Sequence, residues 1–313
     1  MKILVFIQVD DNKINKMSLE ALACAQNLSS DVSAITFNEQ AANELSKYNL
    51  TQIIFAKNDK LQSYHPLNYA KALEKIIDDN CNAILFAHTY ETRDWVPRLS
   101  ARLDFPFISD CVAIKNQNDS LIITRQTYQG KLNNDFESNT NVFCSVQSGC
   151  FKSDSIENGT TEIKTIELEL GDIPNTIRAE EKFKEQKGGV DLTAADLIVS
   201  VGRGIAKEEN LPLAEELKDL LNAELGSSRP IVDYGWLPHD CQIGSSGQVV
   251  SPKLYFSLGV SGAIQHQVGM KGSDKIMAIN KDENAPIFEI ADYSVVGDLL
   301  EIVPKLINKI KES

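Results

Sequence analysis

Residues 254–266 read Leu-Tyr-Phe-Ser-Leu-Gly-Val-Ser-Gly-Ala-Ile-Gln-His, an apolar run that gives way to small residues. A short, nearly continuous apolar run is typical of a strand buried on both faces of a parallel sheet. The small residues lead into an expected helix with His266 in its first turn, and a helix N-terminus favours anions such as a pyrophosphate. Taken alone, His266 is as simply explained as a hydrogen-bonded surface or core residue.

A second glycine turn follows the strand expected at residues 196–201. It reads Gly202-Arg203-Gly204. Two glycines let a backbone approach a ligand closely, and an arginine between them can bind a phosphate through two hydrogen bonds. Because the pattern is not a complete dinucleotide fingerprint, a turn with a solvated arginine remains an equally simple explanation.

A long loop at residues 233–247 is rich in glycine and polar residues and has no helical or strand period. Loops of this length are usually functional or disordered, and Trp236 with its apolar neighbours argues against disorder. The preceding segment, Ser227-Ser228-Arg229-Pro230, adds two hydroxyls and another arginine. Because a residue before proline avoids the helical region, we expect Arg229 to be extended at the start of a strand.

The rest of the chain predicts an α/β fold with two Rossmann-like parallel-sheet domains. In the first domain, buried strands are expected at residues 3–9, 32–37, 53–56 and 83–87, and helices at 18–28, 41–47 and 67–77. Ser18 is a candidate N-cap. Strand-like segments at 111–115, 121–128, 141–148 and 161–170 predict an antiparallel β extension of this domain.

In the second domain, strands are expected at residues 196–201, 230–232, 254–260 and 275–279, and helices at 211–225 and 295–310, the latter bent or restarted at Pro304. A charged stretch ending in two glycines predicts a linker at about 178–190. The expected domains are therefore residues 1–180 and 190–313.

Composition restricts the function classes. The 313 residues carry a net charge of −13, which argues against a nucleic-acid or anionic-membrane surface. No apolar run is long enough to span a bilayer, and the N-terminus lacks the features of a signal or transit peptide, so we expect a cytoplasmic protein without direct membrane insertion. The six cysteines form no C-x-x-C pair and the four histidines no cluster, so no metal site is expected.

Several short motifs occur together in one order, and they resemble the FAD domain of electron-transfer flavoprotein α subunits at the spacing of that family. In this sequence they are Gly202-Arg203-Gly204, Gly226-Ser227-Ser228-Arg229, Gln242-Ile243-Gly244, Ser261-Gly262-Ala263-Ile264-Gln265-His266, Ala278-Ile279-Asn280-Lys281-Asp282, Ala285-Pro286-Ile287-Phe288 and Ala291-Asp292-Tyr293. The first half is similar more loosely, through Pro97-Arg98, Ile108-Ser109-Asp110 and residues 125–130.

The resemblance implies one FAD per α subunit and a role for each part of the site. Arg203 and the turn formed by Ser261, Gly262, Ala263 and Ile264 are expected to hold the pyrophosphate. Asn280, Asp298 and Leu299 are expected to line the adenosine part. Around the flavin, the resemblance places Ser228, Arg229, Ile243, Gly244, Ser245, Ser246, Gln265 and His266. Where the family loop usually reads Gln-Thr, this chain has Ser245-Ser246, which keeps the hydroxyl and loses a methyl group.

The implied function is electron carriage, with no side chain acting as a catalyst. Arg229, Ser246 and His266 are expected to tune the redox potential of the flavin, with Arg229 over the ring and Ser246 near N5. A cation at about 4 Å, in an effective dielectric of roughly 20 to 80, stabilises an added electron by roughly 1–4 kcal/mol. This corresponds to roughly 40–170 mV for a one-electron couple.

The resemblance also implies partners. The first domain is expected to pack on an electron-transfer flavoprotein β subunit that binds AMP or a second FAD, in a heterodimer whose FAD domain swivels. Flavoprotein dehydrogenases, such as the acyl-CoA dehydrogenases of fatty acid β-oxidation, are the expected donors, and a membrane quinone oxidoreductase is an expected acceptor. The alternative is a nucleotide-dependent enzyme, using NAD or an adenine nucleotide, on the same α/β scaffold.

Overall fold

The structure is a computed structural model that describes residues 1–313 except 79, 119, 129, 174–176, 178–191 and 313. The chain divides into two compact units, residues 1–182 and 183–313, which are described separately. The linker expected at 178–190 lies outside the described residues.

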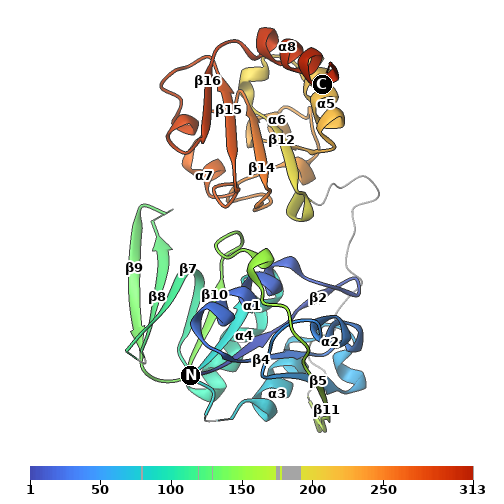
Figure 1. Ribbon diagram of the computed structural model, residues 1–313, viewed down its shortest axis with the longest axis vertical. Coiled ribbons are helices and arrows are strands. Elements are labelled where there is room, and N and C mark those ends of the chain that lie inside the picture. The colour runs from blue at the N-terminus through green and yellow to red at the C-terminus, as the bar shows by residue number, and fades with distance from the viewer. Residues whose placement is uncertain (79, 119, 129, 174–176, 178–191, 313) are drawn as a thin grey trace. The chain divides into compact units, whose positions relative to one another are not determined.

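The first unit is built on a nine-stranded sheet of order β11-β5-β4-β1-β6-β10-β7-β8-β9 (Figure 1). Its strands are β1 (Lys2–Phe6), β4 (Asp31–Thr36), β5 (Gln52–Lys57), β6 (Ala83–Ala87), β7 (Phe107–Gln117), β8 (Ser120–Thr127), β9 (Leu132–Ser138), β10 (Val142–Val146) and β11 (Ile163–Glu167). A hairpin of β2 (Val9–Asp10) and β3 (Lys13–Ile14) follows β1. The pairs from β11 to β7 are parallel, and β7, β8 and β9 pair antiparallel.

Helices cover both faces of this sheet. The apolar residues of α1 (Lys16–Leu28) and α2 (Glu39–Leu45) pack into one core, and those of α3 (Pro66–Ile76) and α4 (Tyr90–Leu103) into the other. Because the central parallel strands are buried on both sides, they need the continuous apolar runs from which they were predicted. The α/β class and the parallel strands are therefore confirmed.

The expected antiparallel extension is only partly right. Residues 142–146 form β10, which is fully buried and pairs in parallel between β6 and β7. Residues 163–167 form β11, which pairs in parallel with β5 at the opposite edge. The Thr161 hydroxyl, which accepts a hydrogen bond from the Leu50 amide, ties this segment to the start of β5. The antiparallel part is β7 with β8 and β9, and β9 was not predicted.

In this unit the N-cap of one helix was predicted wrongly and another helix was not predicted. Helix α1 is capped by Asn15, whose side chain accepts from the Met17 amide, and not by Ser18. Ser18 lies inside the helix and is buried, and its hydroxyl accepts from the Gln8 amide. Helix α4, which contains Pro97, was not predicted.

The second unit is a five-stranded parallel sheet of order β13-β12-β14-β15-β16. Its strands are β12 (Leu197–Val201), β13 (Glu224–Ser227), β14 (Leu254–Leu258), β15 (Ile276–Asn280) and β16 (Tyr293–Val296). The helices α5 (Leu211–Leu221) and α8 (Leu299–Lys311) pack on one face, and loops with the short helices α6 (Arg229–Asp233) and α7 (Ile264–Gln267) lie around the rest. Short 3-10 helices over both units are η1 (Asp59–Leu61), η2 (Ser153–Ser155), η3 (Leu192–Ala194), η4 (Arg203–Ile205), η5 (Glu208–Asn210), η6 (His239–Cys241) and η7 (Pro286–Glu289).

Two helix boundaries and one element type in this unit differ from expectation. Helix α5 ends at Leu221, because Asn222 takes the left-handed conformation and the chain continues into β13. The strand expected at 230–232 is instead the helix α6. The last helix starts at Leu299, since β16 uses residues 293–296, and it continues through Pro304.

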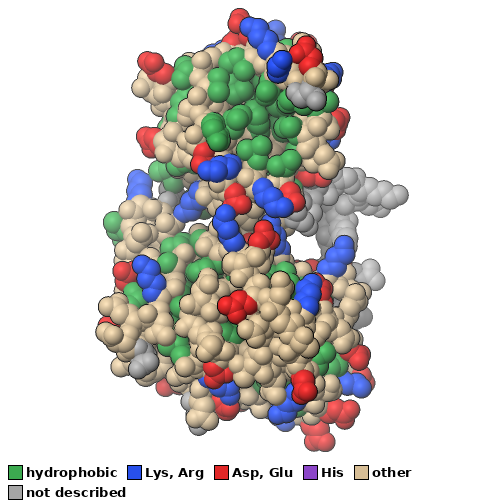
Figure 2. Space-filling view, viewed as in Figure 1, with side chains coloured by type: hydrophobic (Ala, Val, Ile, Leu, Met, Phe, Trp, Pro, Cys, Tyr) green, Lys and Arg blue, Asp and Glu red, His purple; other side chains and the backbone are tan. Residues whose placement is uncertain are grey.

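Lys and Arg side chains are mixed with Asp and Glu over both units on the face shown in Figure 2. This face therefore offers no continuous basic surface to a polyanion. No helix among the described residues is both long enough and apolar enough to cross a bilayer.

A buried acid in α1 gives the first unit a pH dependence that can be measured. Glu20 is 3% exposed and accepts a hydrogen bond from the Gly149 amide at 2.8 Å. Burial raises the pKa of Glu20 to about 7. A folded-state pKa above the unfolded one means that this group's stabilisation is complete at low pH and is lost as the pH rises through about 7.

We expect Glu20→Gln to lose less stability than the wild type between pH 5 and pH 8, because the amide keeps the acceptor and removes the buried charge. Thermal unfolding of both proteins at the two pH values measures this. The exposed Glu137→Gln serves as the control and should follow the wild type. An equal loss of stability in Glu20→Gln and wild type would show that Glu20 does not titrate as described.

Candidate functional site

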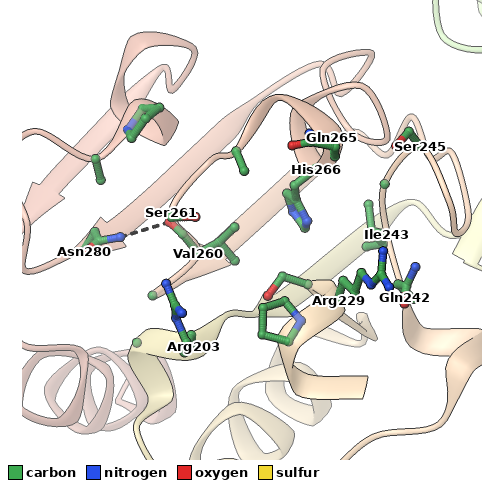
Figure 3. Close-up of a pocket in the computed structure, with 18 of the residues that line it drawn as sticks. Arg203, Arg229, Gln242, Ile243, Ser245, Val260, Ser261, Gln265, His266 and Asn280 are labelled. Carbon is green, nitrogen blue, oxygen red and sulfur yellow. Dashed lines mark hydrogen bonds between the residues drawn. The ribbon is translucent and has the colours of Figure 1, made fainter. Parts of the chain in front are cut away.

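A cavity of about 720 Å³ lies at the carboxyl edge of the sheet in the second unit, where parallel α/β sheets bind their ligands. It collects many of the residues that the sequence analysis assigned to a cofactor: Arg203, Ser228, Arg229, Ile243, Gly244, Ser245, Ser246, Ser261, Ala263, Gln265, His266 and Asn280. Figure 3 shows several of them around the cavity. Segments that are distant in the sequence therefore meet at one place.

The first wall is formed by two glycine turns in contact through their backbones. A β-carbon added to Gly204 would lie 2.6 Å from the Cα of Gly259, and one added to Gly202 would lie 2.4 Å from the Cα of Val260. The Gly204 amide also donates to the Gly259 carbonyl at 2.9 Å. Side chains are excluded at this contact, and the contact places Arg203 beside the end of β14.

The second wall is the turn between β14 and α7. Gly262 has a φ of 79°, and a β-carbon there would lie 2.2 Å from the amide nitrogen of Ile287. The Ile287 amide donates to the Ser261 carbonyl, and the Asn280 side chain donates to the Val260 carbonyl at 2.9 Å. The turn is thus fixed from both sides. The expected helix after it is a single turn, α7.

The long loop forms the third wall and is ordered. The Ile243 amide donates to the Ser227 carbonyl, and the Ser245 amide donates to the Gln265 carbonyl at 2.8 Å. Gln242 donates from Nε2 to the Ser246 hydroxyl at 3.1 Å. These bonds fasten the loop to β13 and α7, so the two serines are held at the cavity.

Arg229 lines the cavity, although not in the way expected. It is the first residue of α6, and the extended residue is Ser228, with a φ of −84° and a ψ of 156°. Pro230 fits the first helical turn because the amide hydrogen it lacks has no partner there. The Arg229 Nε lies 3.4 Å from a carboxylate oxygen of Asp233, and the Arg229 side chain is 70% exposed.

His266 is 6% exposed, and its Nε2 lies 2.7 Å from the hydroxyl oxygen of Tyr255 in β14. Burial lowers the pKa of His266 to about 4, against a smaller opposing effect of the Ile243 backbone. The imidazole is therefore neutral at neutral pH. The charged side chains that line the cavity are those of Arg203, Arg229 and Asp282.

Four of the assigned residues do not line the cavity. Gly262 and Ile264 belong to the turn but do not line the cavity, and Asp298 caps α8 by accepting from the Leu300 amide at 2.9 Å. Leu299 is buried, and a β-carbon on Gly259 would lie 2.9 Å from one of its methyl carbons. Leu299 therefore supports the wall from behind.

The sequence analysis did not assign the remaining lining residues to the ligand. They are Gly204, Pro230, Gln242, Gly259, Val260, Asp282, Ala285 and Pro286. Most belong to the motifs quoted for the resemblance, so the motifs themselves were the available signal. Within the part of the chain that the structure describes, no three His, Cys, Asp or Glu side chains are grouped to hold a metal ion.

Two family models match the chain. Residues 3–170 match the electron transfer flavoprotein domain, and residues 191–271 match the electron transfer flavoprotein FAD-binding domain. The second match includes most of the segments that form the cavity and identifies FAD as the cofactor.

Curated relatives match over most of their length. The electron transfer flavoprotein subunit alpha of Bacillus subtilis is 33% identical, over 99% of this chain and 98% of its own. The subunit of the same name from Syntrophomonas wolfei is 33% identical over 98% of both chains. The acryloyl-CoA reductase electron transfer subunit beta of Anaerotignum propionicum is 35% identical, over 88% of this chain and 84% of its own. The chain therefore belongs to the electron-transfer flavoprotein α-subunit family.

Proposed function

We propose that the cavity of the second unit binds the FAD through which this chain carries single electrons, and that the chain acts as a carrier without catalysing substrate chemistry. The observation that supports this most strongly is the convergence of Arg203, Arg229 and the glycine turns on one cavity. A dianionic pyrophosphate needs cations and closely approaching backbone amides, and this edge of the sheet supplies both.

The pyrophosphate is proposed to lie between Arg203 and the turn at Ser261–Ile264. Glycines at 202, 204, 259 and 262 leave no room for side chains at this place, since an added β-carbon would meet backbone atoms in each case. Of the three residues expected near the adenosine part, only Asn280 lines the cavity. We therefore propose direct contact for Asn280 and a supporting role for Asp298 and Leu299.

The flavin is proposed to lie toward Ser228, the loop at 243–246, Gln265 and His266. FAD supplies the one-electron chemistry when it is bound, and the chain supplies its binding and electrostatics. Arg229 provides positive charge at the cavity, and the carboxylate of Asp233, with which it forms an ion pair, offsets part of that charge. The Ser246 hydroxyl is held by Gln242, which supports the proposed placement of this hydroxyl near N5.

A β subunit is the proposed partner, bound through the first unit. Exposed apolar side chains on the antiparallel part of the sheet support this, since Tyr128 is 76% exposed, Leu132 53% and Phe136 41%. Exposed apolar groups of this kind commonly mark protein–protein contacts.

The electron donors and the acceptor are also proposals. We propose flavoprotein dehydrogenases such as acyl-CoA dehydrogenases as donors, a membrane quinone oxidoreductase as acceptor, and a cytoplasmic location. The relative named as an acryloyl-CoA reductase electron transfer subunit supports a link to acyl-CoA chemistry. Under the alternative, a nucleotide-dependent enzyme, the purified protein would show no flavin absorption in visible light.

Replacing Arg203 tests the pyrophosphate assignment. Removal of a charge-assisted hydrogen bond costs about 1.5–3 kcal/mol, so we expect Arg203→Ala to weaken FAD binding by roughly 10- to 150-fold. Titration of the FAD-depleted protein with FAD measures this. Lys207→Ala, an exposed cation that does not line the cavity, is the matched control. Unchanged affinity in Arg203→Ala would refute the assignment.

Arg229 and Asp233 together test the electrostatic tuning. We expect the potential for adding the first electron to bound FAD to be highest in the wild type, lower in Arg229→Lys and lowest in Arg229→Ala. Because Arg229 is exposed, a high effective dielectric applies, and this potential should be about 40 mV lower in Arg229→Ala than in the wild type. Asp233→Asn should shift the potential in the opposite direction, because it frees Arg229 from its ion pair. Spectroelectrochemical titration at matched FAD content gives all four values, and equal potentials in Arg229→Ala and wild type would show that Arg229 is structural.

Assembly is tested by expression with and without a β subunit. We expect a stable heterodimer with bound FAD, and an α chain that is poorly stable or poorly loaded with FAD when expressed alone. Gel filtration, with protein followed at about 280 nm and bound flavin at about 450 nm, reports both the assembly state and the FAD content. A monomeric α chain that keeps its full FAD content would contradict the proposal.

A further inference from the structure

The first unit has a cavity of its own, which the proposed function does not use. Its volume is about 340 Å³. It lies at the carboxyl ends of β1 and β4, where Gln8 and Asn38 follow these strands. The segment after η1, helix α3 and the first turn of α4 complete the lining.

This cavity lies beside the point where the connections of the sheet change direction. From β1 the chain continues to β4 and β5 on one side, and from β5 it returns to β6 on the other side of β1. The helices α1 and α2 pack into one core, and α3 and α4 into the other. The hydroxyl of Thr89, which follows β6, donates to Gln8 Oε1 at 2.6 Å and spans this point. Open parallel sheets bind their ligands at such a point.

Aromatic rings form part of the cavity wall. Among the described residues that line it, the aromatic ones are Phe6, Phe37, Tyr64 and Tyr69. The ring of Tyr69 lies edge to face with those of Phe37 and Tyr64, with centroids 4.8 Å and 5.3 Å apart. The face of an aromatic ring carries partial negative charge and attracts cations.

A tight hairpin places an acid at the same cavity. The strands β2 and β3 are joined by Asp11 and Asn12, whose φ angles are 48° and 64°. Positive φ at both central residues is typical of two-residue hairpin turns, because their twist matches that of the strands. The Asn15 amide donates to the Gln8 carbonyl at 3.0 Å and fixes the hairpin to the end of β1. Asp11 and Asn12 both line the cavity.

The charge of the lining is negative. Among the described residues, its charged side chains are those of Asp11 and Glu91. The cavity of the second unit instead presents Arg203 and Arg229 beside its glycine turns. A phosphate group needs cations or closely approaching amides of that kind. The lining of the first-unit cavity therefore favours a cation over a nucleotide.

The helix N-termini at this edge of the sheet do not change that preference, because side chains already cap them. Thr89 accepts from the Thr92 amide at the start of α4, and Asn38 accepts from the Ala41 amide at the start of α2. Glu91 lies in the first turn of α4, where a carboxylate offsets the positive end of the helix dipole.

We propose that this cavity is a second ligand site and binds a small quaternary ammonium ion, with Tyr64 and Tyr69 against its methyl groups and Glu91 balancing its charge. A primary ammonium group brings three N–H donors that each need an acceptor. A quaternary one brings none and packs its methyl groups on aromatic rings. The site is separate from the FAD cavity and does not depend on the proposed function.

The test compares two ligands of the same shape. Choline and its neutral isostere dimethylbutanol, in which carbon replaces the charged nitrogen, are titrated into the FAD-loaded heterodimer by calorimetry. We expect choline to bind roughly 5- to 30-fold more tightly, since only the cation gains from the rings and the carboxylates. Equal affinities, or no binding of choline, would overturn the proposal.

Glu91→Gln locates the binding at this cavity. Loss of one carboxylate near a bound cation should weaken choline binding by roughly 4- to 15-fold and leave the binding of dimethylbutanol unchanged. Glu44→Gln removes the same charge from the exposed surface of α2, outside the cavity, and should bind choline as the wild type does. Equal choline affinity in Glu91→Gln and Glu44→Gln would place the cation elsewhere and refute the site.

A pair of variants at Tyr69 tests the aromatic wall. Tyr69→Phe keeps the ring and should keep choline binding, whereas Tyr69→Leu should weaken it by roughly 2- to 10-fold. If Tyr69→Leu does not fold, the two ligands and Glu91→Gln still decide. Equal choline affinity in folded Tyr69→Leu and Tyr69→Phe would contradict the proposed contact with the ring.

Discussion

The site depends on backbone atoms that meet without side chains between them. Gly204 touches Gly259, and Gly262 touches Ile287, at distances that no β-carbon could occupy. A third contact joins Gly244 to Gln265, where an added β-carbon would lie 2.9 Å from the carbonyl oxygen. These contacts bring the ends of separate strands together, so a small number of polar side chains can face one ligand. The cavity is therefore a consequence of the sheet edge and its glycines, and the cations act within it.

The electrostatics of the site divide between exposed and buried groups. Arg229 is largely exposed and paired with Asp233, so solvent and the carboxylate moderate its field. His266 is buried, and burial lowers its pKa to about 4, so it adds no net charge to the site at neutral pH. A carrier that must both accept and release electrons is served by moderate stabilisation of its reduced cofactor, because strong stabilisation would hold the electron.

The sequence predicted the parts of this structure that depend on local chemistry. Continuous apolar runs located the parallel strands, and glycines beside an arginine located the cavity. Prediction from the sequence failed where residues or strands that are neighbours in space decide the local structure. Pro230 suggested an extended Arg229, but proline also fits a first helical turn, and in the structure Ser228 is the extended residue before helix α6. The strands β10 and β11 were taken as antiparallel because sequence does not reveal which strand lies beside them. The partner of His266 was likewise invisible, since Tyr255 looks like any core residue of a strand.

The most direct measurement of the central claim is a crystal structure of the FAD-loaded heterodimer. The account predicts one FAD in the cavity of the second unit, with its pyrophosphate within hydrogen-bond distance of Arg203 and of the turn at Ser261–Ile264, and its flavin beside the loop at 243–246. A structure with full flavin content and this cavity empty would contradict it.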